Sequence, residues 1–285
     1  MWGEADIYDK SHVIDENEDD GTSSPTGTWE LSLTDARIGS LLSGGQARVK
    51  NSTLTEPWNT VYGNARQLVV AGNRIGILTN EGTALVKEGA YDGPWTTLYS
   101  GVKHLVLAGD RIGVITHDGV ARVKAGSLHA SWVPVYSGVQ GLALAGDRVG
   151  VLTTGGAALV KQGSLSALWD PQYTGVTQLV LAGNRIGVLT NTGTALARQG
   201  ALDADDWVTL YADVRQLVMA GDRVGVVDGS NVARVKEGTS LSTNWTRVHF
   251  SAWQLELSAA RIGIINLEWA SVVKHGAISA PWIDQ

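Results

Sequence analysis

The chain has 285 residues, 44% of them apolar, and a formal net charge of −6. This length and composition allow a large buried core, and the absence of cysteine excludes disulfide bonds and thiolate metal sites. The acidic balance argues against nucleic-acid binding, because phosphate contacts need a concentrated basic surface.

The first 28 residues differ in composition from the rest of the chain. They lack the basic start and apolar run of a signal peptide, and no run of 18 apolar residues occurs, so we expect a soluble chain without membrane insertion. A secreted protein without its leader is the alternative. Five carboxylates between Asp15 and Asp20 precede a stretch rich in Ser, Thr and Gly, which predicts an acidic, flexible link over residues 10–28. The acidic run could bind Ca²⁺, although Asp20 stands where an EF-hand loop needs glycine.

Residues 29–282 consist of seven copies of a unit of 37 or 38 residues. Each copy has an arginine, a glycine two residues later, a second cation thirteen residues later and a tryptophan 21 or 22 residues later. The arginines are Arg37, Arg74, Arg111, Arg148, Arg185, Arg223 and Arg261. The second cations are Lys50, Lys87, Lys124, Lys161, Arg198, Lys236 and Lys274, and the tryptophans are Trp58, Trp95, Trp132, Trp169, Trp207, Trp245 and Trp282.

Short runs within the unit, such as HLVLAG, RIGVIT, VARVKAG and WVPVYSG, are rich in Val, Ile, Leu and Tyr and are separated by Gly, Asp and Asn. Each run is typical of a β-strand bounded by tight turns. Four strands in each of seven units predict an all-β fold, a seven-bladed β-propeller of four-stranded antiparallel blades. Radial blades leave only short, protected sheet edges.

We expect a single domain over residues 1–285, with a ring closed by the N-terminal strand. The seventh copy stops soon after Trp282, without the segment ending in tyrosine that follows the tryptophan in blades one to five. Residues 5–8 (ADIY) resemble residues 208–211 (VTLY) of the sixth copy. Residues 1–9 are therefore predicted to complete the seventh blade.

The recurrent polar residues should lie together on one face of the ring, where like charges of the two cations would repel each other. Two interpretations stay open. The arginine could stack on tryptophan and bond to an Asp or a carbonyl, bracing neighbouring blades, or the face could repeat a shallow sugar site in which Trp or Tyr stacks on the pyranose ring. The candidate residues of the repeated ligand sites are Asn73, Arg74, Lys87, Trp95, Asp110, Arg111, Lys124, Trp132, Asp147, Arg148, Lys161, Trp169, Asn184, Arg185 and Trp207.

The tandem motif AGDRIGVLT...GxALVKxGxLxxxWxxxYxGV resembles the propeller repeats of bacterial lectins, particularly actinobacterial tachylectin-like sequences. More distantly, it is similar to the seven-bladed fucose-binding lectins of insect-pathogenic bacteria. The resemblance covers about residues 29–282 and concerns repeat style and blade count. It implies a multivalent carbohydrate-binding protein with pockets at or between blades.

The repeat departs from its own consensus where the seventh copy meets the first. Trp29 and Trp253 stand at the start of the first strand, where other copies have Arg, Lys, Gln or Thr, and Trp269 stands in a turn that carries glycine in blades two to five. The topology predicts that these tryptophans lie near one another and near the acidic link, on the face opposite the recurrent cations. Glu30 and Glu256 mark the innermost strands of the same two copies.

A seam site of Trp29, Glu30, Trp253, Glu256 and Trp269 is therefore a second candidate. If the chain is an enzyme, Glu30, Glu256 and Glu268 are the candidate catalytic residues, because close carboxylates push their pKa values apart. Ordinary divergence of the terminal blades is the alternative. The sequence shows no catalytic Ser-His-Asp, phosphate-binding or HExxH motif, and we predict no metal or cofactor beyond the Ca²⁺ considered above.

Three functions remain open at this stage. The first is a non-enzymatic, multivalent lectin that binds glycans or glycoconjugates, because a ring of near-identical units multiplies weak sites into avidity. The second is an enzyme or single-ligand receptor that uses the seam site, an inference from fold analogy and broken symmetry. The third is a platform for a protein partner.

Overall fold

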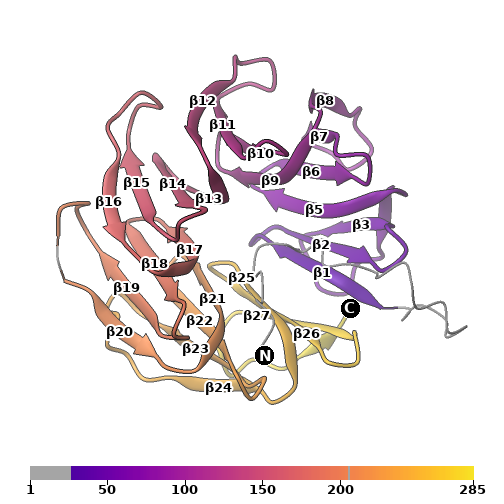
Figure 1. The fold of residues 1–285 in the computed structure, drawn as a ribbon. Helices are drawn as coiled ribbons and strands as arrows, with labels where there is room; N and C mark the ends of the chain where they lie inside the picture. The colour runs from indigo at the N-terminus through magenta and orange to yellow at the C-terminus, as the bar shows by residue number, and fades with distance from the viewer. Residues whose placement is uncertain (1–26, 205) are drawn as a thin grey trace, which may run out of the picture.

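The computed structural model describes residues 27–204 and 206–285, whose 28 β-strands are arranged in a ring (Figure 1). Seven sheets of four consecutive strands form seven blades, and paired strands within each blade run antiparallel. The predicted all-β, seven-bladed propeller is thus confirmed. The described residues include no helix that is long and apolar enough to cross a membrane.

The strands alternate with short turns throughout the ring. Blade 1 contains β1 (Thr28–Leu33), β2 (Arg37–Leu42), β3 (Ala47–Asn51) and β4 (Asn59–Tyr62); blade 2 contains β5 (Ala65–Ala71), β6 (Arg74–Thr79), β7 (Ala84–Glu88) and β8 (Thr96–Tyr99). Blade 3 contains β9 (Val102–Ala108), β10 (Arg111–Thr116), β11 (Val120–Ala125) and β12 (Val133–Ser137); blade 4 contains β13 (Val139–Ala145), β14 (Arg148–Thr153), β15 (Ala158–Gln162) and β16 (Asp170–Tyr173).

The remaining three blades repeat this pattern. Blade 5 contains β17 (Val176–Ala182), β18 (Arg185–Thr190), β19 (Ala195–Gln199) and β20 (Val208–Tyr211); blade 6 contains β21 (Val214–Ala220), β22 (Arg223–Asp228), β23 (Ala233–Glu237) and β24 (Thr246–His249). Blade 7 contains β25 (Ala252–Leu257), β26 (Arg261–Asn266), β27 (Ser271–His275) and β28 (Ile283–Asp284). The first strand of each blade lies nearest the centre of the ring (Figure 1).

The hydrophobic core lies between neighbouring blades. The recurrent glycine of each second strand makes this contact close: a Cβ added at Gly113 would lie 2.5 Å from a terminal methyl of Leu142 in the next blade. The same approach recurs at Gly150, where a Cβ would lie 2.9 Å from Leu179. Glycine therefore repeats in this column because the leucine of the following blade occupies the space of a side chain.

Blade 7 meets blade 1 through ordinary contacts between blades. Thr28 N donates to Trp269 O at 2.9 Å, and the hydroxyls of Thr28 and Ser271 lie 2.9 Å apart. The fourth strand of blade 7, as far as it is described, is β28, which pairs with β27. The predicted closing strand at residues 1–9 lies outside the described residues. The acidic link predicted at residues 10–28 also lies outside them, except for residues 27 and 28. Both stay predictions.

Candidate functional site

Each recurrent arginine donates hydrogen bonds to backbone carbonyls of the next blade. Arg148 Nη1 donates to Asn184 O at 2.7 Å, and Nη2 donates to Gly200 O, 52 residues ahead. The Nη2 bond recurs at every junction, and Arg261 Nη2 closes the ring by donating to Ser52 O at 2.6 Å. The seven side chains are only 1–8% exposed. These arginines therefore brace one blade against the next.

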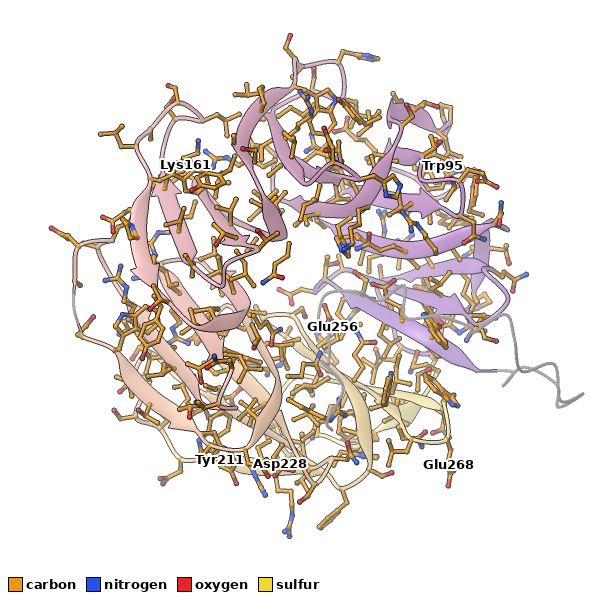
Figure 2. The ribbon with its side chains drawn as sticks, in the orientation of Figure 1. Trp95, Lys161, Tyr211, Asp228, Glu256 and Glu268 are labelled. Atoms are coloured by element: carbon orange, nitrogen blue, oxygen red, sulfur yellow. The ribbon has the colours of Figure 1, made fainter. Side chains whose placement is uncertain are left out.

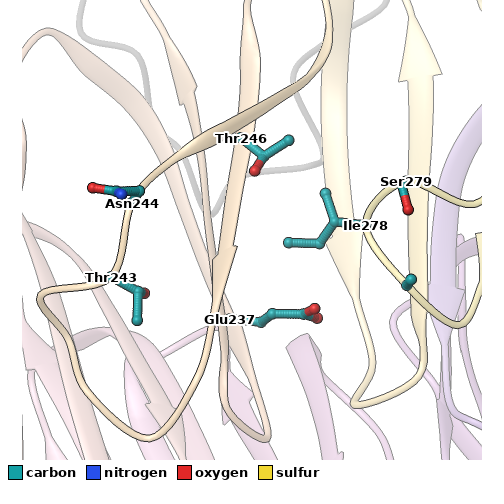
Figure 3. Close-up of a pocket in the computed structure, with 7 residues that line it drawn as sticks. Glu237, Thr243, Asn244, Thr246, Ile278 and Ser279 are labelled. Atoms are coloured by element: carbon teal, nitrogen blue, oxygen red, sulfur yellow. The ribbon is translucent and has the colours of Figure 1, made fainter.

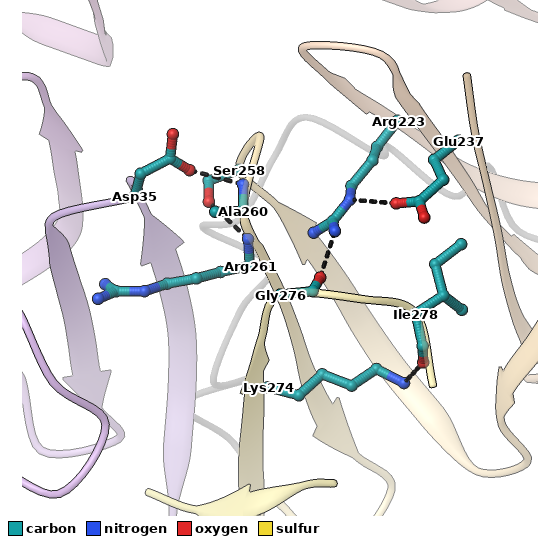
Figure 4. Close-up of polar contacts among 9 residues, drawn as sticks. All are labelled: Asp35, Arg223, Glu237, Ser258, Ala260, Arg261, Lys274, Gly276 and Ile278. Carbon is teal, nitrogen blue, oxygen red and sulfur yellow. Dashed lines mark hydrogen bonds and ion pairs between the residues drawn. The ribbon is translucent and has the colours of Figure 1, made fainter. Parts of the chain in front are cut away.

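A further polar column orients the same arginines. Arg223 Nε donates to Glu237 Oε2 at 3.0 Å while its Nη2 donates to Gly276 O (Figure 4). Arg74 and Glu88 form the equivalent ion pair at 2.8 Å. These partners follow directly after the second cation and were not among the predicted site residues. The signal in the sequence is a polar residue at that position in six of seven copies.

The second cation of each unit is buried under the tryptophan of its own blade. Lys161 Nζ lies 4.5 Å from the Trp169 ring centroid and donates to Leu165 O. The six lysines of this column are 3–4% exposed and lie 4.3–4.7 Å from their tryptophan rings. Burial lowers the pKa of every one of them. Arg198 takes this place in blade 5.

The recurrent tryptophans also contact the preceding blade. Trp132 Nε1 donates to Leu98 O at 3.2 Å, and its ring meets Tyr99 edge-on at 5.6 Å between centroids. Five Tyr–Trp pairs and one His–Trp pair follow this pattern between successive blades. Figure 2 shows Trp95, Lys161 and Tyr211 of these columns away from the centre of the ring.

The residue before each arginine lies exposed in a turn at Asn73, Asp110, Asp147, Asn184 and Asp222. At two junctions its backbone carbonyl accepts a bond from the arginine of the preceding blade. The structure thus brings the repeated candidates together on one face. Their cations, however, bond to carbonyls and carboxylates of the protein or lie against tryptophan rings.

The polar column on the innermost strands bridges neighbouring blades. Gln178 accepts from Leu217 N at 2.9 Å and donates to Leu217 O at 2.8 Å. Glu30 is 3% exposed and its Oε2 accepts from Leu68 N at 3.1 Å, so it belongs to the same bridges. Figure 2 shows Glu256 near the centre of the ring and Glu268 at its outer edge, so these two carboxylates are not gathered into one site.

Among residues 27–204 and 206–285, no group of three or more His, Asp or Glu side chains is placed to hold a metal ion. The candidate Ca²⁺ segment at residues 15–20 lies outside that part of the chain and stays a prediction.

The three tryptophans of the seam lie in contact. Trp29 of blade 1 stacks on Trp269 of blade 7 with 5.3 Å between ring centroids and 7° between planes. The ring centroids of Trp253 and Trp269 lie 5.4 Å apart. The turn between β26 and β27 thus carries a tryptophan sandwiched by rings from two innermost strands.

An exposed apolar surface surrounds this cluster. We call Trp29, Phe250, Trp253, Leu267 and Trp269 the seam surface. Phe250 is 67% exposed, and Trp253 and Leu267 are each 46% exposed. Leu267 N donates to the carbonyl of the residue that follows Phe250, which joins the two parts of the surface. Of the four exposed large apolar residues in the described chain, three belong to this surface, so exposed apolar side chains concentrate where the repeat breaks.

Trp269 adopts an unfavourable backbone conformation. Its φ is 62°, in the left-handed region that bulky residues rarely enter. At the equivalent position Gly45, Gly82, Gly119, Gly156 and Gly193 also have positive φ, at no steric cost. A tryptophan therefore stands where five copies have glycine and blade 6 has Asn231, at a backbone cost on the order of 1 kcal/mol.

An open groove with a mixed polar and apolar lining lies between the outer loops of blades 6 and 7. It encloses about 420 Å³ and its lining includes Glu237, Thr243, Asn244, Ile278 and Ser279 (Figure 3). Hydroxyl, amide and carboxylate groups thus surround an aliphatic side chain. Sequence reasoning missed this groove because its residues other than Glu237 lie outside the recurrent columns.

No protein-family model matches the chain, and no curated protein matches it. Solved propellers resemble its fold at low identity. Human WBSCR16 shares 9% identity with a TM-score of 0.63, covering 83% of this chain and 85% of its own. Yeast RCC1 (Prp20), in a structure bound to Kap60, shares 8% identity at a TM-score of 0.61, covering 73% and 69%. YCF48 bound to D1 peptide shares 11% identity at a TM-score of 0.62, covering 89% and 93%.

Proposed function

We propose that the chain is a non-catalytic binding protein that holds a segment of a partner protein on the seam surface. The observation that carries this proposal is the concentration of exposed aromatic side chains around a tryptophan in left-handed backbone. Exposed apolar patches on soluble proteins mark interaction sites, and retained backbone strain is most common at functional positions. Trp and Phe are also typical anchors of protein interfaces.

The candidate residues of the repeated sites favour the seam surface as the binding site, because they are already engaged within the protein. The cations of both columns are buried, and each of them donates at least one hydrogen bond to the protein. A ligand would have to break those bonds and leave buried carbonyls without donors, which costs free energy. The seam surface needs no such exchange, because Trp253 and Phe250 are open to solvent.

Proteins of similar fold support the proposal that the ligand is a protein or a peptide. The propellers named above include one bound to a protein, Kap60, and one bound to a peptide. A propeller presents a rigid face on which a partner can dock without ordering the backbone, and this lowers the entropic cost of binding.

The repeat itself supplies the variants that test the proposal. Trp253→Gln and Phe250→Ser restore residues that other copies carry at these positions, as at Gln140 and Ser100. A displayed library of random 16-residue peptides is panned on the wild-type chain, and each enriched peptide is then measured by fluorescence anisotropy. We expect enriched peptides to lose at least tenfold in affinity on both variants.

Leu168→Ala is the matched control, because Leu168 is exposed by 92% but lies in blade 4 away from the seam. It should leave peptide affinity unchanged. Peptides that bind the two seam variants as tightly as the wild type, or a panning that enriches none, would refute the proposal.

The groove between blades 6 and 7 favours a second candidate, carbohydrate binding of the kind that the lectin-like motif implies. Its volume is typical of small-ligand pockets, and hydroxyl and amide groups suit sugar hydroxyls. A glycan array followed by calorimetry tests it, with Asn244→Ala as the variant. Binding that is abolished by this change supports the candidate, and binding of no sugar, or binding indifferent to Asn244→Ala, counts against it.

A further inference from the structure

Exposed positive charge is scarce on this protein. Among the described Lys and Arg residues, the fourteen of the two recurrent columns are buried, six are half-buried and one, Arg247, is exposed. Fourteen Asp and Glu residues of the same part of the chain are exposed. The outer surface is therefore far more acidic than the formal net charge of −6 suggests.

Arg247 lies at the seam surface. Its guanidinium carbon is 4.2 Å from the ring centroid of Phe250. A second cation, Arg215, lies 5.4 Å from the ring centroid of Trp253. A guanidinium thus lies against each of the two most exposed aromatic side chains of the seam surface.

The two arginines differ in how much of their hydrogen-bonding capacity is used. Arg215 Nη2 donates to Ala252 O at 2.5 Å and to Trp253 O at 2.7 Å, and its Nε donates to Asn231 at 3.0 Å. Arg247 is exposed and bonds to no carboxylate among the described residues. An exposed guanidinium offers N–H groups that match a carboxylate in a two-bond geometry.

We infer that the partner segment held on the seam surface is acidic, with Asp or Glu residues next to a bulky apolar side chain. This inference rests on the proposed function and names the chemistry of its ligand. The apolar side chain packs on Trp253 and Phe250, and a carboxylate accepts from Arg247. Elsewhere on the described surface the exposed carboxylates repel such a segment, so charge favours docking where the one exposed cation of the described residues, Arg247, lies beside the exposed ring of Phe250.

Three labelled octapeptides serve as probes on the full chain. One places a phenylalanine among Asp and Glu residues, the second replaces these by Asn and Gln, and the third replaces them by Lys. We expect the acidic peptide to bind about tenfold more tightly than the amide peptide at low salt, with a smaller advantage as salt rises. Arg247→Thr restores the residue of blades 1, 2 and 5 and should remove most of this advantage, because it lowers the affinity of the acidic peptide far more than that of the amide peptide.

Arg66 provides a matched control for Arg215. Both occupy the same column, and Arg66 Nη2 donates to Val102 O at 2.6 Å, as Arg215 donates to Ala252 O. Arg215→Gln should weaken the acidic peptide severalfold, whereas Arg66→Gln should not. Equal effects of the two changes would mean that loss of packing between blades, and not charge at the seam, explains the result, and would overturn the inference.

The remaining outcomes separate this inference from the proposed function. If amide or lysine peptides bind as tightly as the acidic one and Trp253→Gln still abolishes binding, the acidic partner is wrong and the docking surface stands. If Trp253→Gln leaves acidic-peptide binding unchanged, both fail. A full-length variant with the five carboxylates of residues 15–20 changed to amides is the last arm. If this variant binds the acidic peptide with unchanged affinity, the result supports a separate partner. If it binds the peptide at least tenfold more tightly, the chain's own segment is the occupant and the inference is overturned.

Discussion

The internal junctions and the seam both contain tryptophans, but these are packed within the protein at the internal junctions and partly open to solvent at the seam. At an internal junction, tryptophan covers a buried lysine and meets a tyrosine of the preceding blade, and the arginine is bonded to backbone carbonyls. At the seam, tryptophans stack on one another, and one of them remains 46% exposed. Side chains that are committed within the protein stabilise the ring, whereas side chains left open to solvent are available to a partner. The repeat therefore separates stability from recognition.

The strongest test of this contrast is the arginine brace. Arg148→Met removes three hydrogen bonds and leaves the carbonyls of Asn184 and Gly200 without their donor. We expect the free energy of unfolding to fall by about 3 kcal/mol in urea titrations. Arg247→Thr, at an exposed arginine, should change it by less than about 0.5 kcal/mol. A loss below about 1 kcal/mol for Arg148→Met would show that the brace contributes little.

The recurrent glycine gives the next largest effect. Gly113→Ala places a methyl group 2.5 Å from a terminal methyl of Leu142 in the next blade, so this buried side chain must leave its present position. We expect a loss of about 2 kcal/mol, the usual scale of overpacking in a core. Gly155→Ala is the control, because its nearest neighbour would lie at 3.9 Å. Equal stability of the two variants in urea unfolding would contradict close packing at the junction.

The seam should respond differently. Trp269→Gly loses part of the packing on the blade 7–blade 1 core and the stack on Trp29, about 0.5–1.5 kcal/mol beyond the buried area, but it relieves a left-handed backbone that offsets much of this loss. The free energy of unfolding should therefore fall by less than about 2 kcal/mol, while peptide binding is lost. Thermal and urea unfolding measure the first effect, and anisotropy measures the second. A loss of stability above about 2 kcal/mol would make Trp269 part of the closure of the ring.

Alkaline pH gives the smallest effect. Burial lowers the pKa of Lys161 in the folded chain, whereas the unfolded chain keeps this proton up to the ordinary value of 10.5. Unfolding therefore takes up protons between the two values, and the free energy of unfolding rises with pH in that interval. Urea titrations from pH 8 to pH 10 should show a shallower rise for Lys161→Met than for the wild type. Identical slopes would contradict the direction of this shift.

The fold was predictable because the pattern repeats seven times. Periodic Arg, Gly and Trp columns indicated the blades, and the loss of periodicity at Trp253 and Trp269 indicated the seam. The partners of the arginines were not predictable, because backbone carbonyls 52 residues ahead carry no residue signature. The seam contribution of Phe250 and Arg247 was missed, although both depart from their columns and the same comparison between copies would have found them.

The arginine bond also gives the ring a direction. Each blade donates to its successor and accepts from its predecessor, and Arg261 continues the pattern into blade 1. This is the head-to-tail geometry of a closed cyclic assembly, here built within one chain. Such a ring has no terminal unit that can fray, unlike a linear solenoid, whose end repeats lack a neighbour. Loss of any one junction therefore converts the ring into a linear array, and the two blades at the break then lack a neighbour.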